Sequence, residues 1–127
     1  MTPALLQFVR ACLDEDERIA KGHNQWSPSW HQDDMANEIR DDENAGTVAF
    51  VPCPGDQAHI ARHDPARVLR EVAVKRQLLA IHRRYVEEPG QACRGCAGGI
   101  AWEACPVVRL LASPYSDRPD YREEWRP

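Results

Sequence analysis

The chain has 127 residues, a formal net charge of −4, 43% hydrophobic residues and 28% charged residues. These values are typical of one small globular domain over residues 1–127, which we expect to be soluble and cytoplasmic. No apolar run approaches the roughly 20 residues that cross a bilayer, so we expect no membrane span and no membrane partner. The first apolar stretch runs into an acidic cluster, Asp14 to Glu17, which is not the pattern of a signal peptide.

The first predicted element is a helix within residues 1–22. Thr2 followed by Pro3 is typical of a helix start, because a hydroxyl can cap the first amides and proline needs no amide partner. Apolar residues then recur at helical spacing over residues 5–19, and Gly22 is typical of a helix end. Cys12 lies on the apolar face, so we expect it in the core.

Residues 23–57 form a polar, variable region in which we expect a loop and a short β-hairpin. The run from Thr47 to Val51 is rich in β-forming residues and predicts one strand, with a partner near Trp26 to His31. The segment Cys53-Pro54-Gly55-Asp56 is predicted to be a turn. We expect Trp26 and Trp30 to close the core.

Residues 58–127 contain the central helix, a metal-binding segment and the C-terminal tail. Asp64-Pro65 is again typical of a helix start, and the apolar spacing predicts a helix from Pro65 to about Arg84. Ile100 to Trp102 is predicted to be a strand segment, and Pro106 is predicted to open a short helix from Val107 to Ala112. The predicted fold class is α+β and mainly helical, with two or three helices, a short β-hairpin and a structural zinc site.

Cys93-x-x-Cys96 is the motif with the clearest chemistry. An odd count of five cysteines without a secretion signal argues against a disulfide framework and favours metal binding. Two thiolates at this spacing can reach one ion, and a structural zinc takes four protein ligands. Cys105 adds a third thiolate at the start of the last helix, where the helix dipole favours it. The predicted Zn²⁺ ligands are His82, Cys93, Cys96 and Cys105.

Other ligand sets stay open at this point. Cys53, His59 and His63 precede the central helix and compete with His82 for the fourth position. An iron–sulfur cluster in place of zinc would need a fourth cysteine, which would have to be Cys53 or Cys12.

Charge is divided unequally along the chain. Residues 1–60 carry four basic and eleven acidic side chains, a balance of −7, whereas residues 61–127 carry twelve and nine, a balance of +3. The basic excess lies in and around the central helix, where it can attract phosphates or pair with the acidic half. The candidate nucleic-acid-binding residues are Arg62, Arg67, Arg70, Lys75, Arg76, Arg83 and Arg84.

A resemblance to a known family rests on three stretches of the chain: Ala58–Glu71, Cys105–Tyr115 and Pro119–Pro127. They resemble a family of small uncharacterised proteins from Streptomyces-like actinobacteria and their phages. The match covers most of residues 58–127 and hardly includes residues 23–57, where we expect partner specificity to vary. The resemblance implies a family pattern of a helix-borne His, a Cys pair and a Cys-Pro, and it supplies no activity. The corresponding residues here are His82, Cys93, Cys96 and Cys105.

Two functions follow as expectations. The first is a non-enzymatic adaptor or regulatory protein that is stabilised by a structural zinc and binds a protein or nucleic-acid partner. This expectation follows because no nucleophile–base pair is evident in the sequence. The second is a metal-dependent, nuclease-like enzyme that uses His59, His63 and Asp64. The two differ in coordination, since an enzyme needs an open metal position and a structural site does not.

Overall fold

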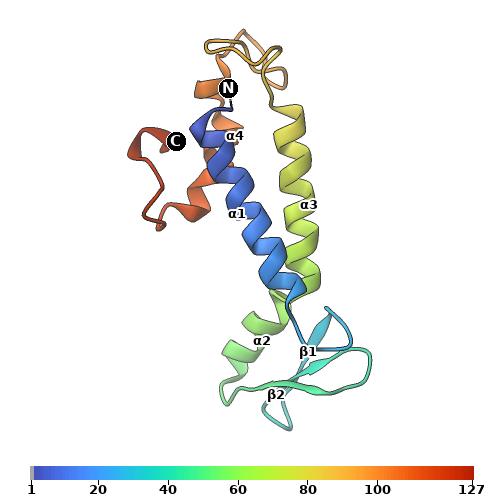
Figure 1. The fold of residues 1–127 in the computed structure, drawn as a ribbon. Coiled ribbons are helices and arrows are strands. Elements are labelled where there is room, and N and C mark those ends of the chain that lie inside the picture. Colours follow the sequence, from blue (N-terminus) through green and yellow to red (C-terminus); the bar gives the residue numbers. More distant parts are fainter. Residues whose placement is uncertain (1) are drawn as a thin grey trace. The chain divides into compact units, whose positions relative to one another are not determined.

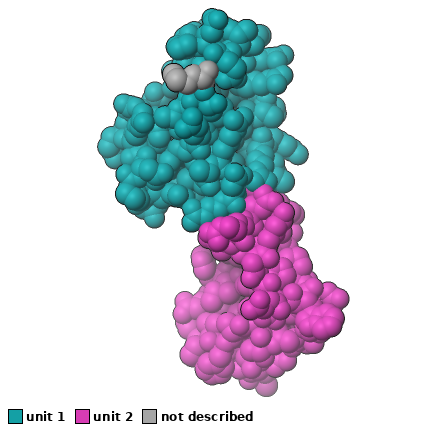
Figure 2. All heavy atoms as spheres, viewed as in Figure 1, with its two compact units in different colours: residues 1–15, 73–127 teal, residues 16–72 magenta. Residues whose placement is uncertain are grey.

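The computed structural model describes residues 2–127 and divides them into two compact units (Figure 2). Unit 1 contains the chain up to Glu15 and residues 73–127, and unit 2 contains residues 16–72. The sequence did not predict this division, and the expectation of a single domain stays a prediction. No helix within residues 2–127 is long and apolar enough to cross a bilayer.

Three predicted helices are confirmed (Figure 1): α1 (Ala4–Lys21), α3 (Pro65–Ile81) and α4 (Pro106–Ala112). The carboxylate of Asp64 caps α3 by accepting the backbone N–H of Arg67 at 2.9 Å. Pro106 stands in the first turn of α4. These starts were predictable because a capping side chain and an early proline satisfy or remove amides that have no partner within the helix.

The sheet of unit 2 has three antiparallel strands in the order β1 (Trp30–Asp33), β2 (Glu38–Asp41) and β3 (Thr47–Phe50). The strand predicted over residues 47–51 is confirmed. The partner predicted near Trp26 to His31 is found later in the chain, at Trp30–Asp33, and the predicted hairpin between the two is wrong. β2 lies between them and pairs with both. The sequence does not predict β2, because Ile39 is its one apolar residue and the strand shows no apolar alternation.

The predicted turn at Cys53–Asp56 is also wrong, because helix α2 (Pro54–Arg62) begins there. Pro54 stands in the first turn of α2, the place where a helix tolerates proline best. Gln57 is fully buried and donates to the backbone carbonyl of Val51 at 2.7 Å. A buried polar side chain therefore joins α2 to the end of β3, and hydrophobic periodicity does not reveal such a contact.

A second buried polar residue, Asp41, organises the turn after β2. Its carboxylate accepts the backbone N–H groups of Ser27 at 2.6 Å, Glu43 at 2.7 Å and Asn44 at 3.3 Å. Burial alone would raise the pKa of this carboxyl, but the three amides stabilise its charge and together lower the pKa below its ordinary value. Asp41 therefore has a structural role in unit 2.

The core of unit 1 combines α1 with the C-terminal tail. The ring of Phe8 lies 5.1 Å from that of Trp125 and 5.8 Å from that of Tyr121, measured between centroids. Cys12 is 1% exposed, which confirms it as a core residue. The prediction for Trp26, in unit 2, is wrong: its side chain is 74% exposed.

Candidate metal centre

Four side chains of unit 1 bring their ligand atoms together. One atom each of His82, Cys93, Cys96 and Cys105 lies within 4.8 Å of the other three. Cys105 Sγ is 3.7 Å from Cys93 Sγ and 3.6 Å from Cys96 Sγ. The Nδ1 atom of His82 is 3.4 Å from the sulfurs of Cys93 and Cys105 and 3.6 Å from that of Cys96. These are the four residues that the sequence predicted as ligands.

Five of the six separations among these atoms are close to the edges of a tetrahedron around one ion. The sixth, between the sulfurs of Cys93 and Cys96, is within 4.8 Å. With zinc–sulfur bonds of about 2.3 Å and a zinc–nitrogen bond of about 2.0 Å, two sulfurs stand about 3.8 Å apart and sulfur and nitrogen about 3.5 Å. The five separations, 3.4–3.7 Å, are close to these values. A disulfide would need sulfurs about 2.05 Å apart, and all three thiols are free.

The backbone around the cluster explains why α3 ends at Ile81 and not at the predicted Arg84. Arg84 forms a β-bridge with Cys93, and the carbonyl of Arg83 accepts the N–H of Arg94 at 2.9 Å. The helix therefore stops where the chain turns to pair with the Cys93 segment. The resemblance implied that His82 lies on the helix. In the structure His82 lies directly after α3.

Residues 92–105, which lead from the Cys93 segment to α4, are held by a few backbone contacts. The N–H of Cys93 donates to the carbonyl of Ile100 at 2.8 Å, and Ala92 bridges to Ala101. The predicted strand at residues 100–102 is reduced to that single bridge, because Trp102–Ala104 forms a 3₁₀ turn. Cys105 follows the turn, immediately before α4.

Trp102 supports the site from the interior of unit 1. Its side chain is 2% exposed, and its indole Nε1–H donates to the backbone carbonyl of His82 at 2.7 Å. Cys93 and Cys105 are also buried, so two of the three sulfurs are shielded from solvent. The position of the imidazole thus depends on a side chain that sequence reasoning missed, although Trp102 stands only three residues before Cys105.

The electrostatics of the cluster favour a bound cation. Burial, and after it the neighbouring thiols of Cys105 and Cys93, raise the pKa of the Cys96 thiol to about 12. Thiolates this close repel one another unless a positive ion lies between them, because each is a full negative charge in a poorly solvated place. The arrangement can therefore hold a soft or borderline dication through three sulfurs and one nitrogen.

Gly95, inside the turn from Cys93 to Cys96, lies close to the imidazole of His82, a contact that the sequence did not predict. A Cβ at this position would lie 2.8 Å from His82 Nδ1 and 2.9 Å from Ile81 Cγ2. Side chains do not pack this closely, so the absence of a side chain lets the imidazole lie against the turn.

Replacing Gly95 by alanine should therefore weaken metal binding. We expect Gly95→Ala to cost about 1–3 kcal/mol of zinc-binding free energy, as overpacking does, measured by competition with a chromophoric chelator. Gly55→Ala is the matched control, since its Cβ would meet nothing closer than Cys53 Sγ at 3.8 Å. Equal zinc affinity in the two variants would contradict the close-approach argument.

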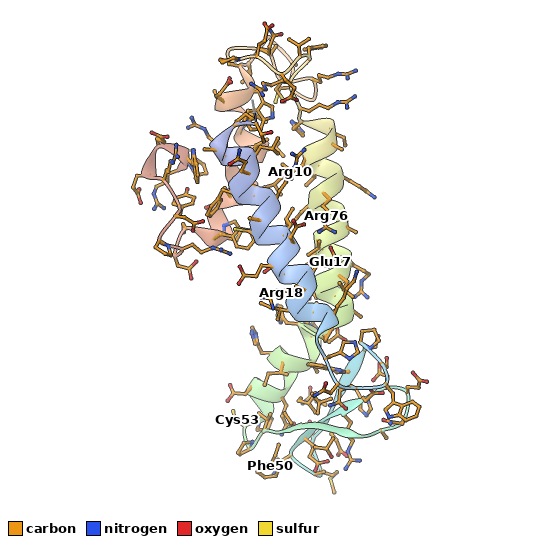
Figure 3. All side chains as sticks on the ribbon, viewed as in Figure 1. Arg10, Glu17, Arg18, Phe50, Cys53 and Arg76 are labelled. Atoms are coloured by element: carbon orange, nitrogen blue, oxygen red, sulfur yellow. The ribbon has the colours of Figure 1, made fainter. Side chains whose placement is uncertain are left out.

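The competing ligand candidates lie in unit 2. Cys53 is exposed and precedes α2 (Figure 3). The rings of His59 and His63 stack at 4.3 Å, and His63 Nδ1 lies 2.8 Å from the carbonyl of His59. Asp64 accepts two backbone amides, from Trp30 at 3.0 Å and Arg67 at 2.9 Å. Within residues 2–127, the side chain that lies beside the three sulfurs is that of His82.

The seven basic candidates do not form one face on α3. Arg67 and Arg76 are nine positions apart, which places them on about opposite sides of the helix. Arg67 pairs with Glu71 at 2.9 Å and Arg76 with Asp14 at 2.8 Å. Nucleic-acid binding by this set stays a prediction; its remaining members are Arg62, Arg70, Lys75, Arg83 and Arg84.

Comparison with known proteins identifies a family and no activity. No curated protein and no solved structure matches the chain. One family model matches residues 2–127, and its description is a family of unknown function (DUF6221). The actinobacterial and phage origin that the resemblance implied stays a prediction. The match covers nearly the whole sequence, and the chain therefore belongs to this family of unknown function.

Proposed function

We propose that the protein is a small zinc-binding, non-enzymatic adaptor or regulator whose metal is structural. The observation that carries this proposal is the set of four protein ligand atoms, three sulfurs and one nitrogen, at tetrahedral spacing. Four protein ligands fill the coordination sphere of zinc and leave no position for a reacting water. Such a site holds a fold together and does not perform hydrolysis.

The surrounding chain gives the metal a structural task. Between His82 and Cys105 the described structure contains two isolated β-bridges and one 3₁₀ turn. Gly90, Gly98 and Gly99 have positive φ angles of 78°, 82° and 70°, conformations that glycine adopts most easily. A segment with so little regular secondary structure gains from an additional link, and a Cys₃His zinc site supplies it.

Zinc is favoured over an iron–sulfur cluster by the same spacing. A cluster binds its cysteines through different iron atoms, so the sulfurs must surround a larger core. Here one imidazole nitrogen and three sulfurs converge on a space that fits one ion. The nuclease-like alternative lacks comparable support, because both oxygens of Asp64 already accept backbone amides.

The proposal is tested by metal content and ligand substitution. Protein purified without added metal should contain one zinc per chain by mass spectrometry. His82→Ala, Cys93→Ser, Cys96→Ser and Cys105→Ser should each weaken or abolish zinc binding. Cys53→Ser, which replaces an exposed thiol of unit 2, should bind zinc like the wild type. Zinc-free wild-type protein that cannot be loaded with zinc would contradict the proposal.

A further inference from the structure

A cavity of about 500 Å³ lies in unit 1 directly beside the candidate metal centre. It is lined by α1, by the last turns of α3 and by the residues that follow α3. Four arginines contribute to it: Arg10, Arg76, Arg83 and Arg84. Figure 3 labels two of them, Arg10 on α1 and Arg76 on α3, at the facing sides of these helices. Its volume falls in the range of small-molecule sites.

Two of the four arginines are neutralised within the cavity. Arg76 pairs with Asp14 at 2.8 Å, and Arg84 pairs with Glu87 at 2.9 Å. Both acidic partners line the same cavity. The ion pairs fix these four side chains and leave their combined charge near zero.

The other two arginines carry unmatched charge. Within residues 2–127, the side chains of Arg10 and Arg83 make no hydrogen bond or ion pair, and both residues are exposed. The lining therefore carries two free guanidinium groups, from elements far apart in the sequence. Two positive side chains that line the same cavity repel each other, and a bound anion offsets this electrostatic repulsion.

The rest of the lining suits a ligand that also has an apolar part. Leu6 and Leu79 contribute apolar surface to it. His82 lines the cavity as well, while its Nδ1 atom faces the three sulfurs. Its second nitrogen, Nε2, makes no hydrogen bond within residues 2–127 and is the one that carries the hydrogen when Nδ1 binds a metal.

We propose that this cavity binds a phosphomonoester of nucleotide size, with Arg10 and Arg83 holding the phosphate. A phosphomonoester carries about two negative charges at neutral pH, which matches two free guanidiniums, whereas a carboxylate would leave one unmatched. Arginine also fits phosphate geometrically through paired N–H donors. The inference rests on the proposed function in one respect: the zinc-held segment positions His82 and Arg83.

The same chemistry has two sources, a free nucleotide and the 5′-phosphate end of a nucleic-acid strand. Full-length protein is titrated calorimetrically with adenosine 5′-monophosphate, with adenosine, and with a short single-stranded oligonucleotide that carries or lacks a 5′-phosphate. The monophosphate should bind at least about tenfold more tightly than adenosine, as expected for charge-assisted contacts. A stronger preference for the phosphorylated oligonucleotide identifies the strand end as the source.

Two variants and a matched control locate the site. Arg10→Gln and Arg83→Gln should each weaken binding of the monophosphate by about tenfold and leave the binding of adenosine unchanged. Arg70→Gln makes the same charge change at an exposed residue of unit 2, outside the cavity, and should have little effect. Equal affinity for monophosphate and adenosine, or an equal loss in all three variants, would overturn the inference.

Zinc content is measured on each preparation, so the two proposals fail separately. Zinc-loaded protein that does not prefer the monophosphate overturns the phosphate site and leaves the zinc proposal intact. Zinc-free protein that cannot be loaded with zinc contradicts the proposed function, and the same titrations on its folded form then decide whether Arg10 and Arg83 bind phosphate without a zinc-held segment.

Discussion

Removal of zinc should unfold the segment from His82 to Cys105 and lower the thermal stability of the whole protein. Structural zinc contributes on the order of 10 kcal/mol to the folding of small zinc-dependent units. That is comparable to the entire stability of an ordinary domain. In this segment the regular backbone structure is limited to isolated bridges and a 3₁₀ turn, and the buried Trp102 is its main other anchor.

Thermal melting followed by circular dichroism, with and without a strong chelator, measures this effect. We expect chelator and mild heating together to unfold the protein, and added Zn²⁺ to restore its helical signal. Mg²⁺ serves as the control, because it prefers oxygen ligands and should not replace zinc at sulfur. Unchanged helical signal and stability in metal-free protein would show that the cluster has no structural role.

Replacement of Trp102 by alanine should be the most damaging single change outside the four ligands. Its indole is 2% exposed, and loss of so large a buried side chain costs about 3–5 kcal/mol. The variant also loses the hydrogen bond to the carbonyl of His82, so we expect weaker zinc binding together with lower stability. Urea denaturation and chelator competition measure the two effects.

Two further variants separate packing from hydrogen bonding. Trp102→Phe keeps much of the apolar packing and removes the N–H donor, and should cost about 1–3 kcal/mol because the His82 carbonyl loses its partner. Trp26→Ala changes a side chain that is 74% exposed and should stay within about 0.5 kcal/mol of the wild type. A Trp102→Ala protein as stable as Trp26→Ala would contradict the support that we assign to Trp102.

The parts of the fold that could be predicted from the sequence have local signals. Each of three helices begins at or directly after a proline: α1 follows Thr2-Pro3, α3 begins within Asp64-Pro65, and α4 begins within Cys105-Pro106. The apolar spacing of α1 and α3 follows the helical period. The four residues of the candidate metal centre were recognisable for a similar reason. Zinc restricts the choice to cysteines and histidines, and a Cys-x-x-Cys pair limits which others can reach it.

The parts that escaped prediction depend on contacts between distant residues. β2 contains Asp41, which reads as part of an acidic turn but is buried with three amide donors. Gln57 reads as polar surface but is fully buried against the carbonyl of Val51. Asp41 and Gln57 both satisfy their polar groups through tertiary hydrogen bonds, and the pattern of hydrophobic residues in the sequence does not predict such bonds.

The details of the candidate site escaped for the same reason. Helical periodicity continues to about Arg84, whereas α3 stops at Ile81 because Arg84 pairs with Cys93. The basic residues read as one group in the sequence, but the helix separates Arg67 from Arg76 and each has an acidic partner. Asp14, Glu71 and Glu87 each pair with one arginine, and the sequence does not show where these acidic residues lie in the fold. It therefore could not predict which arginines have no acidic partner.

X-ray absorption at the zinc edge, on protein purified with its native metal, tests the closed Cys₃His site most directly. The account predicts a first shell of three sulfurs at about 2.3 Å and one nitrogen at about 2.0 Å. His82→Ala should replace the nitrogen by another light ligand or lose the metal, whereas Cys53→Ser should leave the spectrum unchanged. A wild-type shell with fewer than three sulfurs, or with a water oxygen in place of the imidazole, would contradict the structural zinc centre.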